Sequence, residues 1–265
     1  MNALTLELRR SRSIAIWLGV ALAFYGGIMG VMYPVLKSND ALMTQYMNTF
    51  PKEFLAAFGM TGILSDPGVF FTTYIASWLW PIMATAAALI LGTRAVATDL
   101  DRGFLDLPLA TPLSRSRYLA TNITVQALVM AVLSAAAVLG IWLMAAATGN
   151  VFDLGRYALA GVLAWAFGCA IAGPTTLLSV LTLSRGRASG IVGGVLFAMY
   201  AVFVVTQVSK DWSWIAPISA WDHFKTTALI DQGVLPMGDV ALFAAIALGG
   251  WLAAVWAFRR RDLAA

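Results

Sequence analysis

The chain has 265 residues, of which 60% are hydrophobic and only 11% are charged, and its formal net charge is +4. Soluble globular domains are usually about 45–50% apolar and about 25% charged. This composition excludes an ordinary water-soluble protein and predicts an all-α, polytopic membrane protein built as one transmembrane domain.

The first quarter of the chain predicts one membrane surface helix and one span. Segment 1–13 mixes leucines with Glu7 and three arginines, which favours an N-terminal interfacial helix. The uncharged run 14–36 exceeds the roughly 20 residues that a crossing helix needs, so it is the predicted first span. Segment 37–67 is mixed, with phenylalanines at helical spacing, and predicts a short outer helix before the second span.

The second and third spans are predicted at 68–93 and 118–148, and Pro81 should kink or break the former. Between them lies Ala97–Tyr118, a polar interruption that contains acids and arginines. It also keeps the apolar run Phe104-Leu105-Asp106-Leu107, which a purely solvated linker would not need. Composition alone leaves two interpretations open: a surface gripped by a soluble partner, or an ordinary solvated loop.

The remaining spans are predicted at 157–183, 188–208 and 240–258, followed by a cytoplasmic tail, 259–265. Segment 209–239 crowds Trp212, Trp214 and Trp221 together before the last span. Because tryptophan prefers the membrane interface, this segment predicts short outer helices touching the membrane or a re-entrant dip.

Basic residues predict the orientation. With the N-terminus inside, twelve of the 17 Lys and Arg residues fall on inner segments and five on outer ones. The inner residues are Arg9, Arg10, Arg12, Arg94, Arg102, Arg115, Arg117, Arg185, Arg187, Arg259, Arg260 and Arg261, and the outer ones are Lys37, Lys52, Arg156, Lys210 and Lys225. The positive-inside rule then predicts two cytoplasmic termini, a cytoplasmic Ala97–Tyr118 segment and a multi-pass protein of the inner membrane.

The sequence lacks the residues that several kinds of transport and catalysis need. No predicted span contains Asp, Glu, Lys, Arg or His, which argues against a proton relay and against an intramembrane enzyme. His223 and Cys169 are the only residues of their types, so we expect no metal site and no catalytic residues. The four lysines include none in a P-loop pattern, so any ATPase must be a different polypeptide.

The polar interruption resembles a known motif. Asp101-Arg102-Gly103-Phe104-Leu105-Asp106-Leu107, followed by Ala110-Thr111-Pro112-Leu113-Ser114-Arg115, is similar to the signature of ABC-2 type permeases, the membrane subunits of a class of ATP-binding-cassette exporters. The turn that begins at Pro217 and the C-terminal run from Phe258 to Leu263 are also similar to that family. Phe104 and Pro108 depart from the pattern, which has Thr and Leu there, and Pro108 would end a helix or restart one.

The resemblance implies a helix that couples the chain to an ATPase, and a path for the substrate. The coupling residues would be Asp101, Arg102, Gly103, Phe104, Leu105, Asp106, Leu107 and Leu109. It also implies two partner ATPase subunits, which bind ATP and Mg²⁺, and a second permease that makes a homodimer or a heterodimer. The second and fifth spans would line the path, with Trp78, Trp80, Phe197, Tyr200 and Phe203 as wall residues or as ordinary packing and lipid-facing aromatics.

We therefore expect a permease subunit of an ABC exporter, not catalytic itself and without a cofactor of its own. The alternative is a non-transporting membrane scaffold, or an assembly or sensory module, with the same topology. An apolar, uncharged path is compatible with drugs, lipids or lipid-linked molecules.

Overall fold

The structure is a computed structural model, and it describes residues 3–57, 60, 62–101, 114–147, 149 and 153–260. Within these ranges the secondary structure is helical, without a strand. Six of the described segments are long and apolar enough to cross a membrane. The predicted all-α fold with six spans is therefore confirmed.

The six long segments extend beyond the predicted apolar runs. They are α1 (Ala3–Ser38), the composite segment Val69–Thr98, α8 (Arg115–Ala147), α9 (Leu154–Thr182), α10 (Arg185–Val208) and α12 (Met237–Arg260). Each overlaps one predicted range, but most begin or end in charged turns that the prediction excluded. Glu7, Arg10 and Arg94, which lie outside the predicted apolar ranges, therefore belong to these long helical segments.

The composite second segment changes helix type along its length. It joins α4 (Pro67–Phe71), the π-helix η1 (Thr72–Ala76), α5 (Leu79–Thr93), the π-helix η2 (Arg94–Thr98) and α6 (Asp99–Asp101). Regular dihedral angles are lost at Trp78, where φ is −124° and ψ is −65°. Pro81 follows in the first turn of α5, where the absence of an N–H costs a helix least. The break expected at Pro81 thus occurs just before it.

The N-terminal segment is not a separate helix. Helix α1 runs without a break from Ala3 to Ser38, so the residues predicted as an interfacial helix form its first turns. Two polar side chains of these turns, Glu7 and Ser11, are buried. The segment follows the bundle because its charged side chains find partners on the second span.

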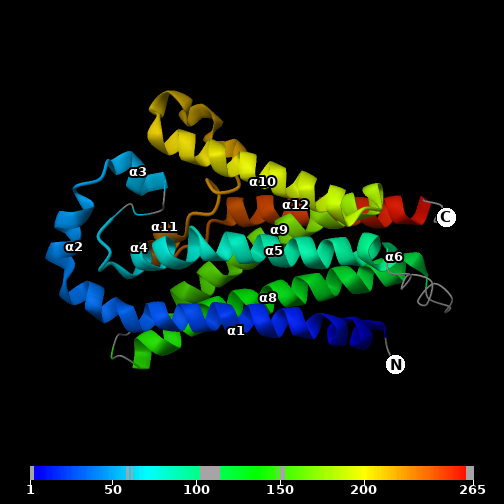
Figure 1. Cartoon of the computed structure of the whole chain (residues 1–265), viewed down its shortest axis with the longest axis horizontal. Helices are drawn as coiled ribbons and strands as arrows, with labels where there is room; N and C mark the ends of the chain where they lie inside the picture. The colour runs from blue at the N-terminus through cyan, green and yellow to red at the C-terminus, as the bar shows by residue number, and fades with distance from the viewer. Residues whose placement is uncertain are drawn as a thin grey trace.

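Short helices gather at the opposite end of the bundle from the two termini (Figure 1). α2 (Asp40–Met47) and α3 (Lys52–Ala57) connect α1 to α4, and the 3₁₀-helix η3 (Lys210–Ile218) and α11 (Thr226–Gln232) connect α10 to α12. Both connections contain short helices; their placement on the outer side of the membrane stays a prediction.

The connection between η3 and α11 enters the bundle. Ser219 is fully buried, and its hydroxyl donates to the carbonyl of Met199 on α10 at 2.8 Å. The rings of Trp221 and Phe224 contact Phe167 of α9, with centroid distances of 5.8 and 4.8 Å. Residues 219–224, which we name the wedge, therefore pack among the long helices.

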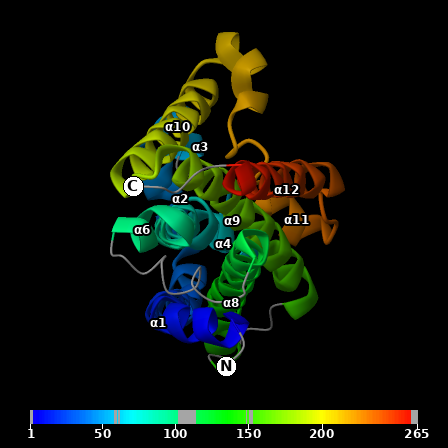
Figure 2. The ribbon, with the colours of Figure 1, turned by 90° about the vertical axis from the view of Figure 1, so that its right-hand side faces the viewer.

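Helix α9 forms the centre of the bundle. It packs against α12, α5 and α8, while α1 lies along the outer side of α8. Figure 2, which looks along the helices, shows α1 and α10 at opposite edges with α9 between them. In α9, 61% of the residues of its most apolar stretch are buried, against 11% in α10. Helix α10 is therefore the span least held by the rest of the chain.

Two helix pairs approach so closely that only glycine fits. A Cβ added to Gly250 of α12 would collide with the backbone of Gly173 and Pro174 on α9, and one added to Gly140 of α8 would collide with the backbone of Ala23 on α1. Close approach at small residues is how helices gain van der Waals contact inside a membrane. These contacts fix α12 and α1 on the central helices.

Candidate functional site

The predicted ATPase-coupling segment is described only at its edges. Asp101 is the last residue of α6. The other predicted coupling residues lie outside the described residues: Arg102, Gly103, Phe104, Leu105, Asp106, Leu107 and Leu109. The structure does describe the helices that lead into this loop and out of it, α6 and α8.

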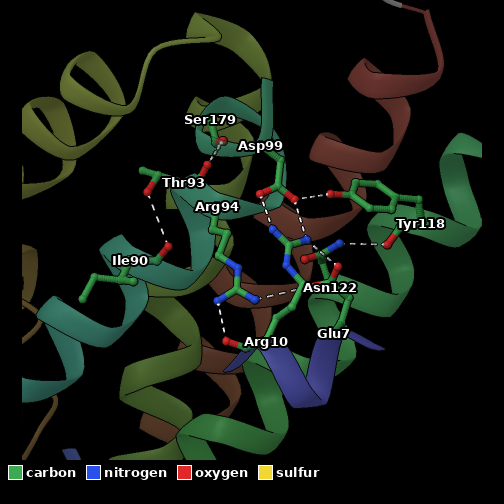
Figure 3. Close-up of polar contacts among 9 residues, drawn as sticks. All are labelled: Glu7, Arg10, Ile90, Thr93, Arg94, Asp99, Tyr118, Asn122 and Ser179. Atoms are coloured by element: carbon green, nitrogen blue, oxygen red, sulfur yellow. Dashed lines mark hydrogen bonds and ion pairs between the residues drawn. The ribbon is translucent and has the colours of Figure 1, made fainter. Parts of the chain in front are cut away.

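Asp99, at the start of α6, is the centre of a buried polar network at this edge (Figure 3). Arg10 of α1 donates to both of its carboxylate oxygens, from Nη1 to Oδ2 at 2.9 Å and from Nη2 to Oδ1 at 2.7 Å. The hydroxyl of Tyr118, in the first turns of α8, donates to Oδ2 at 2.9 Å. Asp99 therefore joins α1, α6 and α8 in one set of hydrogen bonds.

Two further charges complete the network. Glu7 Oε1 accepts from Arg10 Nη1 at 2.9 Å, and Glu7 Oε2 lies 3.7 Å from Arg94 Nη2. Arg94 Nη1 in turn donates to the main-chain carbonyl of Arg10 at 3.0 Å. Two carboxylates and two guanidinium groups thus balance each other. We name Glu7, Arg10, Arg94, Asp99 and Tyr118 the loop clamp.

Burial makes the pairing within the loop clamp obligatory. Asp99 is 1% exposed and Glu7 is 4% exposed. A buried charge is tolerated only when it is paired and hydrogen-bonded, and removal of one partner leaves the other uncompensated. Since Asp99 lies before residues 102–113 and Tyr118 lies after them, the clamp joins the helices on either side, α6 and α8, to α1.

Helix α9 supports the second span just before the clamp. The Ser179 hydroxyl donates to the Thr93 carbonyl at 3.1 Å and accepts from the Ala97 amide at 3.0 Å. Both partners border or belong to the π-helix η2, and π-helical turns are frequent at functional sites. Ser179 therefore ties the segment that leads into the loop to the central helix of the bundle.

Three of the five predicted wall aromatics line one cavity. It has a volume of about 400 Å³, lies between α5 and α10, and includes Trp78, Phe197 and Tyr200 in its lining. Trp221 of the wedge also lines it, and its ring lies 5.4 Å from that of Tyr200. Sequence reasoning assigned Trp221 only to the membrane interface, because nothing local shows that the wedge turns inward.

The other two predicted aromatics lie elsewhere. Trp80 is 1% exposed, and its indole nitrogen donates to the Ala164 carbonyl of α9 at 3.1 Å. It faces the bundle interior because it is two residues from Trp78, on a different face of the helix. Phe203 lies next to Tyr200, with a centroid distance of 6.4 Å, but it does not line the cavity.

The loop clamp is the feature that sequence reasoning missed. Arg10 and Asp99 are 89 residues apart, and both lie outside the predicted apolar runs. A usable signal exists: acids and arginines stand at the same predicted end of the first two spans. In the part of the chain that the structure describes, no group of three or more His, Cys, Asp or Glu side chains forms a metal site.

Fold and site define a multi-pass membrane protein with six long apolar helical segments and a buried polar network at the end where the termini lie. Comparison with protein families agrees with this class. The family model described as ABC-2 family transporter protein matches residues 1–263, so the chain belongs to this family. Membership supports a permease role in an ABC transporter and implies association with an ABC ATPase subunit. No curated protein gives a significant match to the chain.

Proposed function

We propose that this chain is the membrane subunit of an ABC exporter and moves its substrate outward with ATP hydrolysed by a separate subunit. The observation that carries the proposal is the loop clamp, which joins α6 and α8, the helices before and after residues 102–113, to α1 in a chain of the ABC-2 family. A solvated linker would need no such anchoring. Two partner ATPases, docked on this segment from the cytoplasm, bind the ATP and Mg²⁺.

The clamp gives the docked ATPase a way to move several helices at once. Closure of the ATPases over ATP pushes the segment 102–113. The displacement enters the membrane through α6 and α8, and the two hydrogen bonds from Arg10 to Asp99 pass it to α1. Because these charges are buried and mutually compensated, the helix ends move together rather than separating.

The substrate path lies along α5 and α10, where a second permease completes it. Helix α10 is the least buried span, and Phe197 is 74% exposed at the cavity between α5 and α10. A Cβ added to Gly190, Gly193 or Gly194 would meet no other part of the described chain within 4 Å, so the face of α10 with these small residues is open to a second copy or to a related permease. Such a face fits close packing between two membrane subunits in the inner membrane.

The proposal is tested by measuring how much ATPase co-purifies with a variant of the 102–113 segment. A tagged chain is purified from its native membranes, and the co-purifying ABC ATPase is quantified. Leu105→Asp should reduce recovery at least about tenfold, because a charge in an apolar docking face costs more than about 1.4 kcal/mol.

Ser114→Asp is the matched control. It adds the same charge at the far end of the loop, where Ser114 Oγ accepts from the Arg117 amide, and Asp caps a helix as well as Ser does. Equal recovery of the ATPase with both variants, at equal levels in the membrane, would remove the coupling role.

A further inference from the structure

His223 joins two parts of the chain at the end of the bundle opposite the termini. Its Nδ1 lies 2.7 Å from Asp239 Oδ1, in the first turn of α12. Its Nε2 lies 3.0 Å from the main-chain carbonyl of Pro217, near the end of η3. The imidazole therefore connects η3 to α12, and it sits within the wedge.

Both partners of the ring are hydrogen-bond acceptors. A carbonyl oxygen and a carboxylate cannot donate, whereas a neutral imidazole carries only one N–H. The imidazolium carries two, so it alone satisfies both contacts. When the ring loses a proton, one nitrogen lone pair faces an oxygen lone pair at hydrogen-bond distance, and that contact becomes repulsive.

The wedge depends on this contact because His223 lies between its main anchors. On one side, Ser219 bonds to the Met199 carbonyl of α10 and Trp221 packs on Tyr200. On the other side, Phe224 packs against Phe167 of α9. Helix α10 is the least buried span and also contacts α3, η3, α5 and α9, so the wedge is one of the contacts that hold it in place.

We propose that His223, Asp239 and Pro217 form a pH-responsive latch, which holds the wedge and α10 in place when the imidazole is protonated and loosens them when it is neutral. The latch needs only the folded chain and does not rest on the proposed function. Because Trp221 lines the cavity between α5 and α10, latch opening changes the wall of that cavity.

The charges around the ring set the direction of the pH dependence. Partial burial lowers the His223 pKa, but the hydrogen bonds that the ring donates to Asp239 and Pro217 and the charges of Asp239 and Asp222 outweigh it, so the pKa is raised above 6.5. Asp222 is itself paired with Lys225 at 3.5 Å. The His223 pKa is higher in the latched state than the ordinary histidine value of 6.5. The latch is therefore at full strength below pH 6.5 and is lost as the pH rises through the raised pKa of His223.

The first measurement is a histidine titration by NMR. His223 is the only histidine of the chain, so a protein purified through a tag without histidine and labelled at histidine gives one imidazole signal. In the whole chain in lipid nanodiscs, that signal should titrate above 6.5. Asp239→Asn should move the midpoint down, because it removes the facing charge and keeps the shape of the side chain.

The second measurement is hydrogen–deuterium exchange over 217–224, corrected for the intrinsic effect of pH. Protection in the native chain should fall at least about threefold as the pH rises through the His223 midpoint. In His223→Gln, which cannot titrate, protection should be independent of pH over the same range. Because the latch depends on protonation of the imidazole, the NMR titration of His223 and the change in exchange over 217–224 must have the same midpoint.

Asp231→Asn is the matched control at the same end of the bundle. Burial and the neighbouring Asp66 raise the pKa of Asp231, so it is another titratable group with a raised pKa there. This variant should keep the pH-dependent exchange of 217–224. A His223 midpoint at or below 6.5, a midpoint unchanged by Asp239→Asn, or exchange of 217–224 that ignores pH would each overturn the latch.

Discussion

At the scale of single residues, two side chains at the edges of the polar stretch are buried. Asp99 and Tyr118 belong to the polar stretch predicted to be cytoplasmic and solvated or partner-bound, yet both side chains point into the bundle. Local sequence could not reveal this, because a carboxylate is expected to face solvent until its partner is known. The partner, Arg10, lies in a segment that the sequence predicted to rest on the membrane surface.

The first prediction concerns the charge of Asp99. Asp99→Asn removes one of the two described carboxylates that balance the Arg10 and Arg94 guanidinium groups, and we expect a loss of about 3–5 kcal/mol, as for a broken buried pair. The measurement is the midpoint of thermal unfolding in detergent. Asp211→Asn on η3 makes the same chemical change at an exposed site and should leave the midpoint in place. Equal midpoints for the two variants would show that the clamp contributes nothing.

At the scale of elements, apolar run length predicts which helices exist but not where they end. A run of 20 or more uncharged apolar residues has almost no alternative to a crossing helix, so all six were found from sequence. Helix ends depend instead on contacts with distant segments. The first turns of α1 pack on the bundle because Glu7 and Arg10 bond to the second span, and the wedge turns inward because Phe167 and Met199 offer it contacts.

The second prediction tests the α9–α12 contact. Gly250→Ala places a methyl group on the Gly173 backbone, which cannot rotate away, and overpacking of this kind costs about 1–3 kcal/mol. Thermal unfolding of the purified chain should report the loss. Gly249→Ala, at the neighbouring position with open space around it, is the matched control and should be neutral. A tolerated Gly250→Ala would mean that α12 is not held as described.

The third prediction concerns the cavity between α5 and α10. Phe197→Ala removes an exposed aromatic side chain from the cavity wall, and we expect at least a severalfold change in substrate-stimulated ATP hydrolysis by the assembled complex, without loss of ATPase binding. Leu252→Ala removes an equally exposed apolar side chain from α12, away from this cavity, and should have little effect. The same response from both variants would argue that lipid contact, rather than a path, explains Phe197.

At the scale of the whole molecule, the two features on which the proposals rest lie at opposite ends of one helix bundle. The loop clamp lies at the end that holds both termini, and the latch lies at the other end (Figure 1). The second span and α10 run between them and border the cavity. In the proposed mechanism, an input at residues 102–113 reaches the cavity from one end, and the wedge restrains the cavity wall from the other.

The measurement that tests the central claim most directly is photocross-linking from position 105 in native membranes. A photoreactive amino acid replaces Leu105, the membranes are irradiated, and the protein attached to this chain is identified. We predict one main adduct, with an ABC ATPase on the cytoplasmic side, and its loss when position 252 carries the same group. Adducts with lipid alone, or with a protein on the opposite side of the membrane, would contradict the account.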